Sequence, residues 1–218
     1  GNRLMEVLRH FEFGISTAAL LLLVVYYVHL YHKTRNDPLS TALGLARRTR
    51  ALWVQTIMKG GKDILAVQTL RNWTMAATFL ASAAILIGLG IFNLAVTADK
   101  QGELSQLIAP FSSAHPGFWL VKLIILGADF LFAFFNFTLA VRYYNHTGFM
   151  INLPVDSSME ITVEDVIQIL DRGGTHYTLG MRGYYLAIPL ALWLIGPLWL
   201  LAGTLLLITI LYRLDRGV

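Results

Sequence analysis

The chain has 218 residues, of which 56% are hydrophobic and only 14% charged, and its mean hydropathy is +0.60. Soluble domains carry about 25% charged residues, so this composition excludes a soluble globular protein and indicates an integral membrane protein. The absence of cysteine excludes disulfides, thiolate catalysis and cysteine-ligated metal clusters. The net charge of +4 comes from segments beside apolar stretches, which is typical of a topology signal.

Four apolar segments are long enough to cross a hydrocarbon core about 30 Å thick. They cover residues 13–31, 73–96, 118–141 and 184–212. The last contains Pro189, Gly196 and Pro197, and we expect it to tilt or kink because proline removes a backbone hydrogen bond. The sequence therefore predicts an all-α, polytopic helical bundle with four transmembrane helices, which forms a single integral membrane domain over residues 1–218.

Basic residues are distributed unevenly around these spans. The segments 32–72 and 142–183 carry eleven Lys and Arg residues, whereas the terminal segments and the loop between the second and third spans carry five. Under the positive-inside rule, this asymmetry predicts that the two basic segments are cytoplasmic and that both termini lie on the non-cytoplasmic side. Such segments also attract anionic lipid, so we expect membrane lipids with anionic headgroups as partners and no nucleic acid.

The two cytoplasmic segments are predicted to hold short amphipathic helices. In residues 45–58 the apolar side chains lie toward one side and the arginines largely opposite, and a glycine pair ends the helix. A second helix starts at Thr162, whose hydroxyl can cap the backbone in a box with Asp165, and is expected to stop at the Arg-Gly-Gly stretch 172–174. Because this second helix is acidic, we expect it to pack against the basic first segment.

The third span carries polar residues at seven-residue intervals, which places them on one helix face. This intramembrane polar seam consists of Lys122, Asp129, Asn136 and Tyr143. Asp129 lies near the bilayer midplane, where an ionised carboxylate costs at least a few kcal/mol, so it must be neutral, paired or hydrated. Lys122 is about 10 Å away along the helix axis, too far to pair with it directly, and is expected to snorkel outward.

Three interpretations of Asp129 stay open. It is a protonated or hydrogen-bonded residue that fixes helix register, part of a proton or cation path, or a contact for a partner. The group it faces is a hydroxyl of the second span such as Ser82, a water molecule, or the same seam in another subunit. A permeation path would need oligomerisation, because four spans alone enclose little space.

Polar and basic residues cluster where the second, third and fourth spans end on the cytoplasmic side. The residues of this predicted rim are Arg71, Asn72, Arg142, Asn145, His176, Arg182 and Tyr184. If they meet at one depth, arginine can hold a phosphate through two parallel hydrogen bonds, so the rim predicts a site for an anion or a lipid headgroup. The alternative is ordinary positive-inside arginine beside an interfacial tyrosine belt.

The second span carries a stripe of small residues, which lets helices approach closely in lipid. This predicted helix-packing stripe consists of Ala77, Ala81, Ala84 and Gly88. His29 and His32 are candidate haem or metal ligands, but the pattern is weak, so we expect no cofactor and no metal site. The sequence contains no His-carboxylate metal motif, glycine-rich nucleotide loop or nucleophile–base set that would indicate an enzyme.

Three stretches resemble a known family of membrane proteins. They cover residues 65–88, 132–145 and 176–199, and they place arginine–asparagine, arginine–aromatic–asparagine and Gly-Met-Arg-Gly-Tyr clusters at the ends of spans. In these clusters the chain resembles the bacterial branch of the family known as domain of unknown function 599. The resemblance implies a multi-span helical protein of the bacterial cytoplasmic (inner) membrane, and it brings no activity, substrate or catalytic residue.

We therefore expect a non-catalytic integral membrane protein. It would self-associate as a homo-oligomer or serve as an accessory subunit of a larger membrane complex, and it would carry the anion or lipid-headgroup site in the cytoplasmic leaflet. The alternative function is an oligomeric channel or small transporter for protons or ions that uses the midplane carboxylate of Asp129.

Overall fold

A computed structural model of the chain describes residues 2–97, 116–154 and 161–216. Its elements are, in order, α1 (Asn2–Asn36), the short 3-10 helix η1 (Pro38–Ser40), α2 (Ala42–Gly60), α3 (Asp63–Thr97), α5 (Pro116–Met150), α6 (Val163–Ile195) and α7 (Pro197–Leu214). All except η1 and α2 are long and apolar enough to cross a membrane, which gives five candidate spans. The all-α, multi-pass architecture is confirmed, but with five candidate spans where the sequence predicted four.

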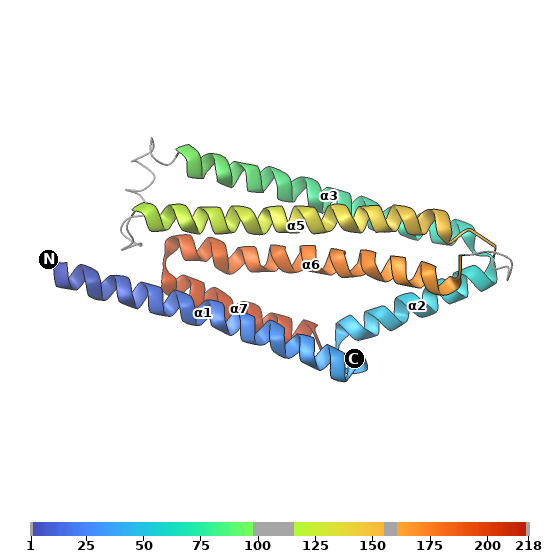
Figure 1. Cartoon of the computed structure of the whole chain (residues 1–218), viewed down its shortest axis with the longest axis horizontal. Coiled ribbons are helices and arrows are strands. Elements are labelled where there is room, and N and C mark those ends of the chain that lie inside the picture. The colour runs from blue at the N-terminus through green and yellow to red at the C-terminus, as the bar shows by residue number, and fades with distance from the viewer. Residues whose placement is uncertain (1, 98–115, 155–160, 217–218) are drawn as a thin grey trace.

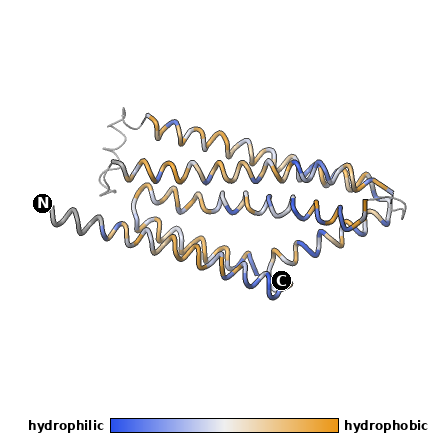
Figure 2. The backbone as a smooth tube through the Cα atoms, in the orientation of Figure 1, coloured by the Kyte–Doolittle hydropathy of each residue, from blue (hydrophilic) through white to orange (hydrophobic). Residues whose placement is uncertain are grey.

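The long helices run side by side in one bundle. α5 lies between α3 and α6, and α7 packs against both α6 and α1 (Figure 1). α2 runs obliquely from the end of α1 towards the start of α3 and packs against α6. Hydrophilic residues gather along α2 and the adjoining half of α6, whereas apolar residues dominate the other long helices (Figure 2).

The prediction of one fourth span over residues 184–212 is wrong, because this segment is the junction of two antiparallel helices. α6 ends at Ile195, and α7 begins at Pro197 after the chain reverses at Gly196. Proline disfavours helical backbone in the residue before it and suits the first position of a helix, so Pro197 ends one helix and starts the next. Pro189 lies inside α6 without ending it.

The reversal places the two chain ends at opposite ends of the bundle. Arg216 forms an antiparallel bridge with Thr41, and the Ala42 amide donates a hydrogen bond to the Asp215 carbonyl at 3.1 Å. The C-terminal end therefore lies beside the start of α2, while α1 begins at the far end of the bundle (Figure 1). The side of the membrane on which each terminus lies stays a prediction.

The helices of the predicted cytoplasmic segments begin and end at specific caps. The Thr41 hydroxyl accepts a hydrogen bond from the Gly44 amide at the start of α2, and Gly61 ends α2 in the left-handed conformation with a φ of 59°. α6 begins with the predicted capping box, in which Thr162 and Asp165 each accept a hydrogen bond from the other's amide. The start of α6 and the glycine stop of α2 agree with the sequence pattern, whereas α2 begins three residues before the predicted position 45.

The expectation that Gly173 and Gly174 end this helix is wrong. Both lie inside α6, where a Cβ at Gly173 would be 2.8 Å from the Tyr144 ring and one at Gly174 would be 2.6 Å from the Arg50 guanidinium carbon. Glycine costs a helix about 1 kcal/mol relative to alanine, and the close contacts with α5 and α2 offset that cost. α6 therefore runs without interruption through residues that the sequence assigned to a cytoplasmic segment.

Small residues also line the contact between α3 and α5. Ala77, Ala81 and Ala84 are at most 5% exposed, and Gly88 is buried as well. A Cβ at Gly88 would lie 3.3 Å from the Phe130 Cβ of α5. The small-residue stripe thus faces α5, where it permits close approach of the two helices.

The glycine contact between α5 and α6 can be tested with Gly180→Ala. A Cβ at Gly180 would lie 2.8 Å from the ring of Phe137, whose side chain is fully buried and has no room to move. Overpacking of this kind costs about 1–3 kcal/mol, so the variant should melt at a lower temperature in detergent. Gly90→Ala is the matched control, because no atom lies within 4 Å of a Cβ there; equal melting temperatures for the two variants would contradict the packing.

The five-span arrangement predicts which positions share a side of the membrane. Because the chain has no cysteine, single substitutions give unique labelling sites for a membrane-impermeant maleimide. Lys59→Cys and Arg213→Cys should be labelled from the same side, and His10→Cys from the opposite side. A four-span arrangement predicts instead that positions 10 and 213 are labelled together.

Candidate functional site

Lys122 does not snorkel outward, as the sequence predicted, but is fully buried in an ion pair. Its Nζ lies 2.7 Å from Oε1 of Glu12 on α1, and the two side chains are 0% and 6% exposed. The ammonium also lies 5.0 Å from the ring centroid of Phe118 and 5.5 Å from that of Trp193. Glu12 supplies the countercharge that stabilises the buried Lys122 ammonium, since leaving such a charge unpaired costs about 3–5 kcal/mol.

Asn136 and Tyr143 of the predicted seam both contact His176 of the predicted rim. The Nδ1 of His176 lies 2.9 Å from the Oδ1 of Asn136, and the ring of Tyr143 stacks on the imidazole with 5.6 Å between centroids. The Asn136 amide nitrogen donates to the Phe132 carbonyl at 2.9 Å. These groups satisfy one another within one chain, so the seam is divided into separate contacts rather than forming a continuous polar row.

The arginines of the predicted rim do not converge. Arg71 and Arg142 are exposed on α3 and α5, whereas Arg182 is mostly buried and pairs with Asp215 at 2.6 Å. Arg182 follows His176 by six residues in α6, which places it about 9 Å further along the helix axis. Arg182 therefore lies at a different depth from His176 and is held in an ion pair with Asp215.

The remaining rim residues also serve other contacts. Asn72 and Asn145 are exposed on α3 and α5. The Tyr184 hydroxyl donates a hydrogen bond to the Leu80 carbonyl, so it ties α6 to α3. The rim residues thus make separate contacts within the chain, and an anion site at the rim stays a prediction.

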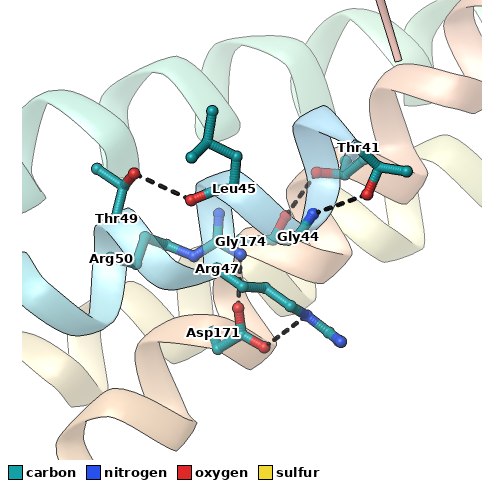
Figure 3. Close-up of polar contacts among 9 residues, drawn as sticks. Thr41, Gly44, Leu45, Arg47, Thr49, Arg50, Asp171 and Gly174 are labelled. Carbon is teal, nitrogen blue, oxygen red and sulfur yellow. Dashed lines mark hydrogen bonds and ion pairs between the residues drawn. The ribbon is translucent and has the colours of Figure 1, made fainter. Parts of the chain in front are cut away.

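A different pair of arginines joins the basic α2 to the acidic start of α6. Arg50 lies 2.5 Å from one Asp171 oxygen, and Arg47 lies 3.1 Å from the other (Figure 3). Gly174 lies directly beneath Arg50, because a side chain at that position would collide with the guanidinium. The expected docking of the second segment on the first is thus present, and a single carboxylate serves two arginines.

A cavity of about 560 Å³ lies beneath α2, between that helix and α3, α5 and α6. Its polar lining consists of Thr49, Arg50, Tyr144, Tyr177, Thr178 and Arg216. No acidic side chain lines it among the residues that the structure describes. The cavity wall therefore carries positive charge and hydroxyl groups, which suits an anion.

The two cavity arginines keep hydrogen-bonding capacity. The Arg50 Nε is buried and has no hydrogen-bond partner within the described part of the chain. Arg216 donates to the Tyr212 hydroxyl at 2.7 Å and lies 4.5 Å over the same ring, and no carboxylate pairs with it among the described residues. Because Asp171 balances only one of the two arginines that it contacts, the wall of the cavity has a net positive charge.

A second polar cluster lies deeper, where α1, α6 and the C-terminal end of α7 meet. Asp215 accepts a hydrogen bond from the Tyr26 hydroxyl at 2.6 Å and pairs with Arg182 at 2.6 Å. The Arg182 guanidinium carbon lies 5.4 Å from the ring centroid of Tyr27. This cluster fastens the last residues of the chain to α1 and α6.

Asp129 faces α6 and not the hydroxyls of α3. A Cβ at Gly183 would lie 3.5 Å from its Oδ1, whereas Ser82 is exposed and donates to the Thr78 carbonyl of its own helix. The Asp129 Oδ2 is buried and lacks a partner among the described residues. The sequence therefore located Asp129 within the bundle but not the group that it faces.

Sequence reasoning missed Glu12, Arg50, Asp215 and Arg216 as site residues. Glu12 was placed outside the first span, although Glu12, Ser16, Ala19 and Leu23 follow a helical period and all are buried. That spacing was the available signal for Glu12. No local pattern reports the contacts of Asp215 and Arg216, because they depend on the reversal between α6 and α7. Within the described residues, no cluster of three or more His, Cys, Asp or Glu could hold a metal ion.

Comparisons with known proteins identify the family and no activity. Neither a curated protein nor a solved structure matches the chain. The family described as "Protein of unknown function, DUF599" matches residues 15–217, which include the five long helices almost completely. The chain therefore belongs to this family.

Proposed function

We propose that the protein is a non-catalytic multi-pass membrane protein that binds the phosphate of an anionic lipid headgroup in the cavity beneath α2. The observation that carries this proposal is the basic cavity wall, which Arg50 and Arg216 line; among the described residues only Arg50 is paired with a carboxylate, that of Asp171. A guanidinium can hold a phosphate through two parallel hydrogen bonds, and Tyr144 and Tyr177 add hydroxyl donors. The proposed anion site thus lies in the cavity beneath α2 and not at the rim that the sequence pattern suggested.

We also propose that the α2 end of the bundle is cytoplasmic, in the cytoplasmic membrane of a bacterium. With five spans, Arg213 and Arg216 join the side that carries the basic segments, so that side has twelve Lys and Arg residues, without counting the buried Arg182, against three on the other. The positive-inside rule favours the richer side as cytoplasmic. On this orientation the N-terminus lies outside the cell and the C-terminus inside.

The position of the cavity favours a lipid headgroup over a free anion. Arg216 follows the last turn of α7, so the cavity lies where the apolar helices α1 and α7 end. Headgroup phosphates gather at this level of an anionic leaflet, and each nearby Lys or Arg contributes about 1 kcal/mol of attraction. Trp73 and Ala76 line the cavity towards α3 and supply an apolar wall for the first part of an acyl chain.

Within the membrane, we propose that the protein self-associates or serves as an accessory subunit of a larger complex. Large apolar side chains are exposed along α3, among them Met75, Phe79 and Leu86 at 63%, 73% and 71%. These side chains suit lipid as well as a second helix surface. The mass of the particle extracted in a mild detergent tests this proposal. An assembly supports it, and a monomer contradicts it.

The alternative function, an oligomeric channel or small transporter for protons or ions that uses Asp129, stays a prediction. Two other seam residues have partners inside the chain, because Lys122 pairs with Glu12 and Asn136 contacts His176. A path along α5 would therefore need those contacts to open. The headgroup site is the better-supported function because its residues already surround a cavity.

Headgroup binding should depend on the cavity arginines in a charge-specific way. Arg50→Gln and Arg216→Gln should each lower the affinity for phosphatidylglycerol by about ten- to a hundredfold, since a hydrogen bond to a charged group contributes about 1.5–3 kcal/mol. Asp171→Asn should raise the affinity, because it removes the carboxylate that competes for Arg50. Native mass spectrometry of the purified protein, with the lipid titrated in, measures these changes.

Arg48→Gln is the matched control, because Arg48 is an exposed arginine on the same helix that does not line the cavity. The affinity of this variant for phosphatidylglycerol should stay within about twofold of that of the unaltered protein, since only a distant surface charge is lost. If Arg48→Gln and Arg50→Gln lower the affinity equally, the lipid is attracted by the general surface charge and the proposed site is contradicted. Displacement of the lipid by inorganic phosphate at equal concentration would identify a free anion as the ligand and oppose a headgroup site.

A further inference from the structure

Three polar atoms near the centre of the bundle are buried without a hydrogen-bond partner among the described residues. They are the Asp129 Oδ2 of α5, the Tyr27 hydroxyl of α1 and the Arg182 Nη1 of α6. Buried polar groups are nearly always hydrogen-bonded, so three such atoms from three neighbouring helices call for a physical explanation. None of these residues belongs to the cavity beneath α2.

Asp129 reaches towards α6 at the position where Gly183 leaves room for it, since a Cβ there would lie 3.5 Å from the Asp129 Oδ1. Tyr27 and Arg182 are neighbours, because the Tyr27 ring is 5.4 Å from the Arg182 guanidinium carbon. The Asp129 Oδ2 is buried and has no hydrogen-bond partner among the described residues.

An ionised Asp129 would lack a countercharge, because the cations near it are already paired. Arg182 is neutralised by Asp215 at 2.6 Å, and Lys122 is neutralised by Glu12 at 2.7 Å. In the described part of the chain, no Lys or Arg forms an ion pair with Asp129. A carboxylate within the membrane without a countercharge is unfavourable by at least a few kcal/mol, and one bound proton removes that cost.

The titratable and charged groups on the surrounding helices support this count. α1 contributes Tyr26 and Tyr27, α6 contributes Arg182 and Tyr185, and the end of α7 contributes Asp215. α3 has no titratable side chain between residues 72 and 97, and the nearest one on α5 is Lys122. With both ion pairs balanced and the tyrosines neutral, the group has a net charge of −1 when Asp129 is ionised and zero when it is protonated.

We infer that Asp129 is a proton-binding site inside the bundle. The ligand is a single proton, which the Asp129 carboxyl group takes up and releases. Arg182 and Asp215 keep their charges in both states and hold α1, α6 and α7 around the site. The inference needs neither permeation nor the headgroup site, so either can fail alone.

Infrared difference spectroscopy of the full chain in lipid nanodiscs, between acidic and alkaline buffer, tests this site. The unaltered protein should show a carboxylic acid carbonyl band that disappears as the pH rises. Asp129→Asn, which keeps the shape of the side chain, should lose this band, whereas Asp171→Asn should retain it. A band that does not titrate in the folded protein, or one that survives Asp129→Asn, overturns the inference.

If Asp129→Asn fails to fold, carboxyl-labelled aspartate in the unaltered chain keeps the test: a titrating band that does not shift with the label excludes Asp129.

Discussion

The arrangement of the molecule depends on the chain reversal at Gly196, immediately before Pro197. Proline at the first position of α7 cannot extend the preceding helix, and it restricts Gly196 to extended backbone. α7 then packs antiparallel to α6, where Gly203 lies so close to Leu192 that a Cβ would be 2.7 Å from its Cδ1. This one constraint converts a single predicted span into two helices and brings the C-terminal end to α2.

Both polar sites contain residues that the reversal delivers. Asp215 reaches Arg182 and Tyr26 deep in the bundle, and Arg216 reaches the cavity beneath α2. Neighbouring residues thus serve a buried ion pair and a basic cavity wall. Breaking a buried pair by removing one partner costs about 3–5 kcal/mol, so the C-terminal residues are held firmly. A ligand in the cavity beneath α2 and a proton at Asp129 would therefore both act on helices that Asp215 and Arg216 hold together.

The sequence predicted the features that depend on local pattern. Hydropathy indicates the long helices, Thr162 with Asp165 indicates the start of α6, and the small residues of α3 indicate its contact face. It failed where distant contacts decide the outcome. The glycines at 173 and 174 look like a helix stop until Tyr144 and Arg50 occupy the space beside them. Lys122 looks like a surface anchor because its partner, Glu12, lies 110 residues away.

The central claim is that the C-terminal end lies against the start of α2 on the same side of the membrane. Thr41 and Arg216 are paired in an antiparallel bridge, and the Cα atoms of such pairs lie about 4.5–5.5 Å apart, within the range for a disulfide. The most direct measurement is therefore mild oxidation of a Thr41→Cys, Arg216→Cys double variant in membranes. The account predicts an intramolecular disulfide in the monomeric chain, and two cysteines that stay free under oxidation and are labelled from opposite sides of the membrane would contradict it.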